Sequence, residues 1–181
     1  MAYWNIKNVA LRGVTGTVSN NPVKSADLPI FTQEEADVFD KAVGIRSRYI
    51  SPENVCASDL CQNAGERLLA TLAWKKETVD VLLFVSVTGD YKTPPTSAIL
   101  QERMGLPNDI FVLDVPMGCC GSLYGIAIAG NLLSAGTAKR ALVLVGDTAI
   151  RMGSNQDKSR MPLFGDSGTA MALEFDTKAE D

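Results

Sequence analysis

The chain has 181 residues, a formal net charge of −4, and apolar and charged fractions of 46% and 21% that are ordinary for a soluble globular protein. This length is enough for one domain with a sizeable core, and the mildly acidic balance argues against a nucleic-acid-binding protein. Because no apolar run approaches the roughly 20 residues that cross a bilayer, we expect one domain over residues 1–181 and no membrane or nucleic-acid partner.

Strand-like and helix-like segments alternate along the chain. After a short strand over residues 9–15, Thr32 and Glu35 resemble a capping box that opens a helix to Val43, which Gly44 ends. The remaining helices are expected over about 58–75, 96–104 and 122–135, and the remaining strands over 80–88, 110–115, 141–145 and 169–175. This alternation predicts an α/β fold with a mostly parallel sheet.

Some residues within these segments indicate how the elements pack. The run at residues 80–88 is almost wholly apolar, which is typical of a strand covered on both faces. Gly125 and Gly130 interrupt an apolar helix, and such glycines usually permit close approach of a neighbouring element. Arg46 and Arg48 follow the first helix in a basic, aromatic segment that we interpret as a solvated loop, with anion contacts as the alternative.

The cysteines and the lack of histidine limit the chemistry. Cys56, Cys61, Cys119 and Cys120 fit neither a disulfide framework nor a CxxC metal site, so we expect free thiols, no bound metal and a reducing cytoplasmic location. Cys61 lies on an apolar helical stripe and is expected in the core. The chain contains no histidine, the usual general base near neutral pH. Any thiol chemistry therefore needs a base from elsewhere, or does not occur.

The segment from Phe111 to Tyr124 is the strongest candidate for chemistry. An apolar run ends in a short turn, and Cys119 and Cys120 directly precede a helical pattern. A thiol at a helix N-terminus faces unpaired N–H groups and the positive end of the helix dipole, which lowers a cysteine pKa. Such a thiolate could attack an acyl thioester and hold the acyl group. A buried cysteine pair that packs the turn is the alternative, and the segment alone leaves both open.

Four blocks, in order, resemble the β-ketoacyl-acyl carrier protein synthase III family. Asp114–Gly121 resembles its nucleophile segment, and counting back from Gly121 selects Cys119 as the acylated residue and leaves Cys120 as a packing residue. Residues 43–50, 138–147 and 164–170 resemble three further blocks of the family. The resemblance implies the N-terminal half of a thiolase-like fold, with a mixed, mostly parallel sheet and flanking helices. The C-terminal half, which supplies the catalytic His and Asn in this family, has no counterpart here.

The resemblance also implies a function. It indicates an acyltransferase that loads an acyl primer onto Cys119 and condenses it with malonyl-carrier protein, in fatty acid or related biosynthesis. Without the other half we expect the isolated chain to be inactive. The alternative is a non-catalytic half-fold partner or dimerisation subunit of a split ketosynthase. We further expect a homodimer through the strand at 110–115, and an apolar face near residues 123–133 that the other half covers.

The implied substrates are acyl-coenzyme A or an acyl carrier protein, with no separate cofactor. Arg46, Arg151 and Lys158 are the candidate contacts for a phosphopantetheine phosphate, and each alone is equally a surface charge. The expected first helix lacks the tryptophan that clamps coenzyme A in the family, which favours the carrier protein as donor. The loop Gly165–Gly168 is interpreted as a structural loop near the acyl site rather than a phosphate cradle. Asp114 is interpreted as a capping carboxylate.

Overall fold

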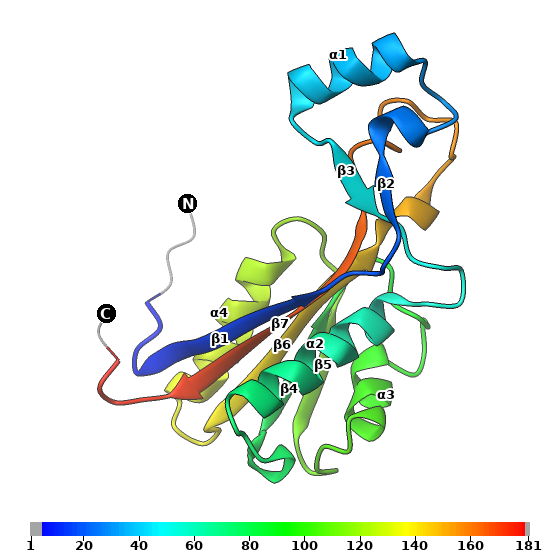
Figure 1. Cartoon of the computed structure of the whole chain (residues 1–181). Helices are drawn as coiled ribbons and strands as arrows, with labels where there is room; N and C mark the ends of the chain where they lie inside the picture. Colours follow the sequence, from blue (N-terminus) through cyan, green and yellow to red (C-terminus); the bar gives the residue numbers. More distant parts are fainter. Residues whose placement is uncertain (1–4, 180–181) are drawn as a thin grey trace.

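The computed structural model describes residues 5–179, and its centre is a five-stranded mixed sheet (Figure 1). In sheet order the strands are β1 (Val9–Thr17), β7 (Asp166–Phe175), β6 (Arg140–Thr148), β4 (Val81–Val85) and β5 (Phe111–Val115). β4 pairs in parallel with β5 and β6, whereas β7 is antiparallel to β6 and to β1. Because β7 alone points the opposite way, the expected mixed, mostly parallel sheet is confirmed.

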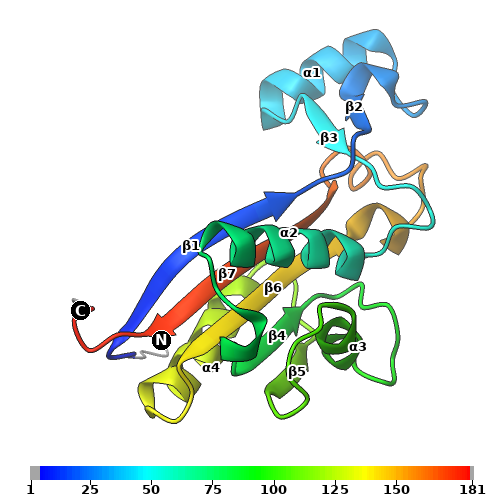
Figure 2. The ribbon, with the colours of Figure 1, turned by 60° about the horizontal axis from the view of Figure 1, so that its bottom comes forward.

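Helices cover both faces of this sheet (Figures 1 and 2). They are α2 (Ala57–Thr71) and α3 (Thr96–Arg103) on one face and α4 (Gly121–Ser134) on the other. Alternate side chains of β4 enter the two cores: Leu82 and Phe84 pack on the α2 side, and Val81 and Leu83 pack on the α4 side. Every residue of β4 is buried, which confirms the expected coverage on both faces. Within the described range no helix is long and apolar enough to cross a membrane.

Two elements are shorter than expected, for local reasons. The helix expected over 58–75 ends at Thr71, because Ala73 adopts a left-handed conformation with φ 52° and turns the chain. The strand expected over 80–88 ends at Val85. The amides of Val87 and Thr88 donate to the side chain of Asp147 instead of continuing the ladder.

Glycines let α4 approach the sheet closely. A Cβ on Gly125 would lie 2.7 Å from Cγ1 of Val143 and 3.0 Å from Cγ2 of Val85, both buried β-branched side chains. A Cβ on Gly130 would lie 2.9 Å from Ile6. The expected role of both glycines in close packing is therefore confirmed.

A smaller layer stands at one end of the sheet (Figure 1). It comprises α1 (Gln33–Val43), the ribbon of β2 (Pro22–Lys24) with β3 (Ser47–Tyr49), and the turns η1 (Ser25–Asp27) and η3 (Ala149–Met152), while η2 (Lys76–Thr78) lies in the main body. The capping box is confirmed, since Thr32 and Glu35 exchange side-chain and backbone hydrogen bonds and Gly44 ends α1 with φ 82°. The solvated loop expected around Arg48 is wrong. This residue lies in β3 and is only 4% exposed, because its guanidinium packs inward and donates to Ser25.

Candidate active site

The turn between β5 and α4 presents both of its cysteines to solvent. The amide of Gly121 donates to the carbonyl of Gly118 at 2.7 Å, so Cys119 and Cys120 are the two central residues of a β-turn. Cys120 has φ −90° and ψ −2°, the values of the second central position in a type I turn. Both thiols are free and exposed. The buried cysteine pair considered as an alternative is therefore wrong, as is the packing role expected for Cys120.

Cys119 lies on the wall of a cavity of about 450 Å³ at the carboxyl ends of the parallel strands. Its apolar lining comes from Val87, Val145, Ala149, Met152 and Phe164. Polar groups come from Ser122, Asp147, Ser167 and Thr169. A thiol beside an apolar hollow with a few polar groups is an arrangement that can hold an acyl chain next to a nucleophile.

Asp147 fixes one wall of this cavity. A single carboxylate oxygen, Oδ1, accepts from the hydroxyl of Ser86 at 2.8 Å and from the amide of Val87 at 2.8 Å. The amide and hydroxyl of Thr88 also donate to it, at 3.1 and 2.9 Å. These contacts hold the loop after β4, and with it the Val87 side chain, against the cavity. The sequence analysis did not identify Asp147 as a site residue. The available signal was an acidic residue two positions after the expected strand over residues 141–145.

The loop from Phe164 to Gly168 is held from inside the protein. Asp166 is 2% exposed, and its carboxylate accepts from the amides of Ser51 at 2.8 Å and Ile150 at 3.3 Å. Gly165 and Ser167 line the Cys119 cavity. The geometry therefore agrees with a structural loop beside the candidate site and not with a phosphate cradle.

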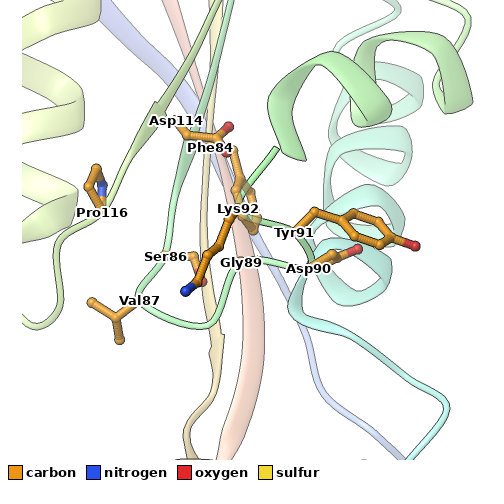
Figure 3. Close-up of a pocket in the computed structure, with 9 residues that line it drawn as sticks. All are labelled: Phe84, Ser86, Val87, Gly89, Asp90, Tyr91, Lys92, Asp114 and Pro116. Carbon is orange, nitrogen blue, oxygen red and sulfur yellow. The ribbon is translucent and has the colours of Figure 1, made fainter. Parts of the chain in front are cut away.

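Asp114 caps a helix, as expected. Its two carboxylate oxygens accept from the amides of Thr96 and Ser97, each at 2.7 Å, at the start of α3. It also lines a second cavity of about 680 Å³ beside β5, between Val87 and Pro116 on one side and Tyr91 on the other (Figure 3). No cysteine lines this larger cavity, so the Cys119 cavity is the candidate active site.

None of the three candidate phosphate contacts lines the Cys119 cavity. Arg151 donates to the carbonyls of Pro52 and Val55, the second at 2.8 Å. Lys158 contacts both carboxylate oxygens of Glu35, at 2.7 and 2.9 Å, and holds the pKa of that carboxyl below its usual value. Arg46 is exposed beside the acidic side of α1.

Cys56 and Cys61, at the start of α2 and within it, differ from the pair before α4. Cys61 is fully buried in the core, as expected, and burial raises its pKa to about 12. Cys56 is half-buried just before α2. Its pKa is raised first by burial and then by the charges of Asp90 and Asp59. Among residues 5–179 no group of three or more acidic or cysteine side chains could hold a metal ion.

Comparisons with known proteins agree with this geometry. The family model of 3-oxoacyl-[acyl-carrier-protein] synthase III matches residues 113–181. A β-ketoacyl-[acyl-carrier-protein] synthase III of Erythrobacter litoralis is 32% identical over 165 residues, which cover 91% of this chain and 51% of the relative. The enzyme of the same name from Neisseria gonorrhoeae is 29% identical over 168 residues, covering 93% and 52%.

Solved structures extend the match to the fold. The crystal structure of a 3-oxoacyl-(acyl-carrier protein) synthase from Burkholderia xenovorans superposes with a TM-score of 0.92 at 35% identity, over 97% of this chain and 50% of that one. A 3-oxoacyl-(acyl carrier protein) synthase III from Pseudomonas aeruginosa superposes with a TM-score of 0.85 at 26% identity, over 97% and 53%.

The mixed sheet, its flanking helices and these superpositions define one α/β half of a thiolase-like protein. Within that class the chain belongs to the 3-oxoacyl-[acyl-carrier-protein] synthase III family, a family of acyltransferases, and the resemblance to its N-terminal half is confirmed. The chain spans about half the length of the curated relatives that it matches.

Proposed function

We propose that this chain is the acyl-accepting half of a 3-oxoacyl-[acyl-carrier-protein] synthase III and that Cys119 is its nucleophile. The observation that carries the proposal is the exposed Cys119 thiol, in the turn before α4, on the wall of a cavity lined by apolar side chains. The whole enzyme would condense an acyl primer with malonyl-carrier protein, with loss of carbon dioxide, in fatty acid or related biosynthesis.

The loading step needs only an acyl thioester and the Cys119 thiolate. The sulfur attacks the thioester carbonyl, a new carbon–sulfur bond forms, and the pantetheine thiolate leaves and takes up a proton. The backbone N–H of Cys119 is one donor for the oxyanion of the tetrahedral intermediate. Condensation needs more. The chain has no histidine, so we assign the catalytic His and Asn to the second half and expect no condensation by this chain alone.

The outer face of α4 supports a second half as partner. Leu123 is 68% exposed and Tyr124 is 43% exposed, and α4 contains no charged residue. A groove of about 420 Å³ that includes Ile128 and Leu132 continues this apolar face. An exposed apolar surface of this kind marks an interaction site. The second half would cover it.

The free edge of β5 supports a homodimer. β5 is the last strand of the sheet, and Phe111 and Leu113 are 45% and 38% exposed on it. An edge strand with apolar side chains is a template for pairing with another chain. Val112 points the other way and packs against the core, so Leu113→Lys probes this edge with less damage to the fold than Val112→Lys.

The acyl donor is the phosphopantetheine thioester of coenzyme A or of an acyl carrier protein, with no further cofactor. Arg46, Arg151 and Lys158 stay our candidate phosphate contacts. All three are exposed, and Arg151 and Lys158 already bind oxygens that a phosphate would replace. The free thiols suit the reducing cytoplasm as the compartment.

A non-catalytic half-fold partner is the second candidate function. The lack of histidine and the apolar face of α4 favour it, because both fit a chain that only pairs with another. The exposed Cys119 beside its cavity favours the first.

Mass spectrometry separates the two. The purified chain is incubated with acetyl-coenzyme A or with an acetylated carrier protein, and the adducts are mapped to peptides. We expect one acetyl group on Cys119, no adduct in Cys119→Ser and an unchanged adduct in Cys120→Ser. If Cys119 accepts no acyl group from either donor but still reacts with iodoacetamide, the non-catalytic function is favoured.

A further inference from the structure

The proposed function uses one thiol of the turn before α4 and leaves its neighbour without a role. Cys119 and Cys120 are both free and exposed, whereas Cys61 is buried and Cys56 is half-buried. The two exposed thiols are adjacent in the sequence, so the same reagents can reach both. Such a pair can act as one ligand with two sulfurs.

The backbone of the turn sets what the pair can bind. Consecutive Cα atoms lie about 3.8 Å apart, below the roughly 4.4–6.8 Å that a relaxed disulfide requires. A direct bond between Cys119 and Cys120 is therefore strained. A larger atom placed between the two sulfurs removes this constraint, because two bonds to it separate the sulfurs further than one S–S bond of about 2.05 Å.

The side chains are free to adopt that arrangement. Cys119 and Cys120 occupy the two central positions of the turn that the Gly121 to Gly118 hydrogen bond closes. Each thiol moves between staggered rotamers by rotation about one bond. Around Gly118, the position of a Cβ has only Val87 within 4 Å, at 3.9 Å, so this side of the turn is uncrowded. Because both side chains are exposed, we infer that they can rotate toward one another on this side of the turn.

We propose that Cys119 and Cys120 form a dithiol site for trivalent organoarsenicals and similar soft, thiophilic centres. With an arsine oxide, R–As=O, two arsenic–sulfur bonds form, and the oxygen leaves as water with the two thiol protons. No electron transfer takes place. Thiolates are the soft ligands that such centres prefer. Two sulfurs on one turn hold the arsenic far longer than one, because the second bond forms within the molecule.

The site has a consequence for Cys119. α4 has no acidic residue in its first turn, so no carboxylate of this helix competes with the two thiols for the N–H groups at its N-terminal end. An arsenic held between the two sulfurs occupies the thiol that lines the cavity and closes it to thioesters. Cys120 therefore determines how sensitive the protein is to reagents that bind two thiols. This role is separate from any role in acyl loading.

Phenylarsine oxide tests the site in the full chain. The parent is Cys56→Ser, which removes the half-buried thiol of α2 and leaves Cys61 as a buried background thiol. Intact mass should show one phenylarsenic adduct, retained in excess glutathione and released by 2,3-dimercaptopropanol. Cys120→Ser and Cys119→Ser each leave one exposed thiol, and we expect each to bind about 100-fold more weakly.

The controls separate loss of the site from loss of the fold. Each serine variant should keep the far-ultraviolet circular dichroism of the parent and should still be alkylated at its remaining thiol. The proposal is overturned if Cys120→Ser binds phenylarsine oxide as tightly as the parent, or if glutathione removes the arsenical from the parent. Neither outcome depends on acylation of Cys119, so the proposed function is tested separately.

Discussion

Two helices on opposite faces of the sheet begin next to cysteines, but their N-terminal ends differ. At α2, the amide of Cys56 donates to the Asp59 carboxylate at 2.7 Å, and the half-buried thiol has a raised pKa. At α4, the first turn holds no acidic residue, and Cys119 and Cys120 are exposed. Two cysteines that precede helices therefore lie in different environments. We expect high reactivity only where the thiol is exposed and the helix end is free of its own carboxylate.

The solvent-facing sides of α2 and α4 also differ. α2 exposes mostly polar residues, including Asn63, Glu66 and Arg67, as a helix at a solvent boundary does. α4 exposes Leu123 and Tyr124 and carries no charge. α2 is therefore polar on its solvent-facing side, whereas the outer face of α4 is the apolar surface that we propose meets a partner.

The largest expected effect concerns self-association. We expect the chain to dimerise or associate further at micromolar concentration. Because each change places a charge on an exposed apolar surface, Leu113→Lys or Leu123→Lys should raise the dissociation constant about 200-fold, the equivalent of about 3 kcal/mol. Glu66→Gln on the outer face of α2 is the control and should change nothing. Light scattering that gives a monomer mass for the unmodified chain would refute this prediction.

Next in size is the loss of the Asp147 carboxylate. Asp147→Ala leaves the donors of Ser86, Val87 and Thr88 without their shared acceptor, and should lower the free energy of unfolding by about 2–3 kcal/mol. Asp147→Asn keeps one acceptor oxygen and should cost about 1 kcal/mol. Urea unfolding measures both. Equal stability of Asp147→Ala and the parent would show that the contacts contribute nothing.

A smaller effect is expected when a glycine of α4 or of α2 is replaced by alanine. A Cβ on Gly125 meets two stiff, buried valines at 2.7 and 3.0 Å, whereas on Gly65 the shortest contact, 2.8 Å, is to the flexible end of Met104. Gly125→Ala should therefore lower the free energy of unfolding by about 1–2 kcal/mol more than Gly65→Ala. Both changes remove a helical glycine, so the gain in helix propensity cancels. Identical midpoints in urea would contradict this account.

The smallest effect is at the start of α2. Asp59→Asn removes a negative charge that raises the pKa of Cys56, so alkylation of Cys56 near neutral pH should become about two- to threefold faster. The gain is limited because burial, which raises this pKa most, is unchanged. Slower alkylation of Cys56 in the variant would mean that Asp59 acts on this thiol in another way.

Local patterns in the sequence predicted the parts of the fold that depend on local chemistry. The capping box at Thr32, the αL glycine after α1 and the apolar run of β4 were all correct, because each is encoded within a few residues. The ribbon of β2 and β3 was missed, because its pairing joins segments more than 20 residues apart and each strand is only three residues long.

The candidate site also combines local and long-range features. The strand, turn and helix pattern and the family resemblance predicted Cys119 as the nucleophile, and its role stays a prediction. The exposure of Cys120 did not follow, because adjacent cysteines in a turn can point either inward or outward. The four hydrogen bonds to Asp147 join the ends of β4 and β6, which no local pattern connects.

Competitive alkylation of the four thiols tests the central claim most directly. The folded chain is treated with limiting iodoacetamide near neutral pH, and each cysteine is quantified by peptide mass spectrometry. We expect Cys119 to react fastest, Cys56 more slowly, and Cys61, which is buried and has its pKa raised to about 12, slowest of the three. Equal rates for Cys119 and Cys56 would contradict the account.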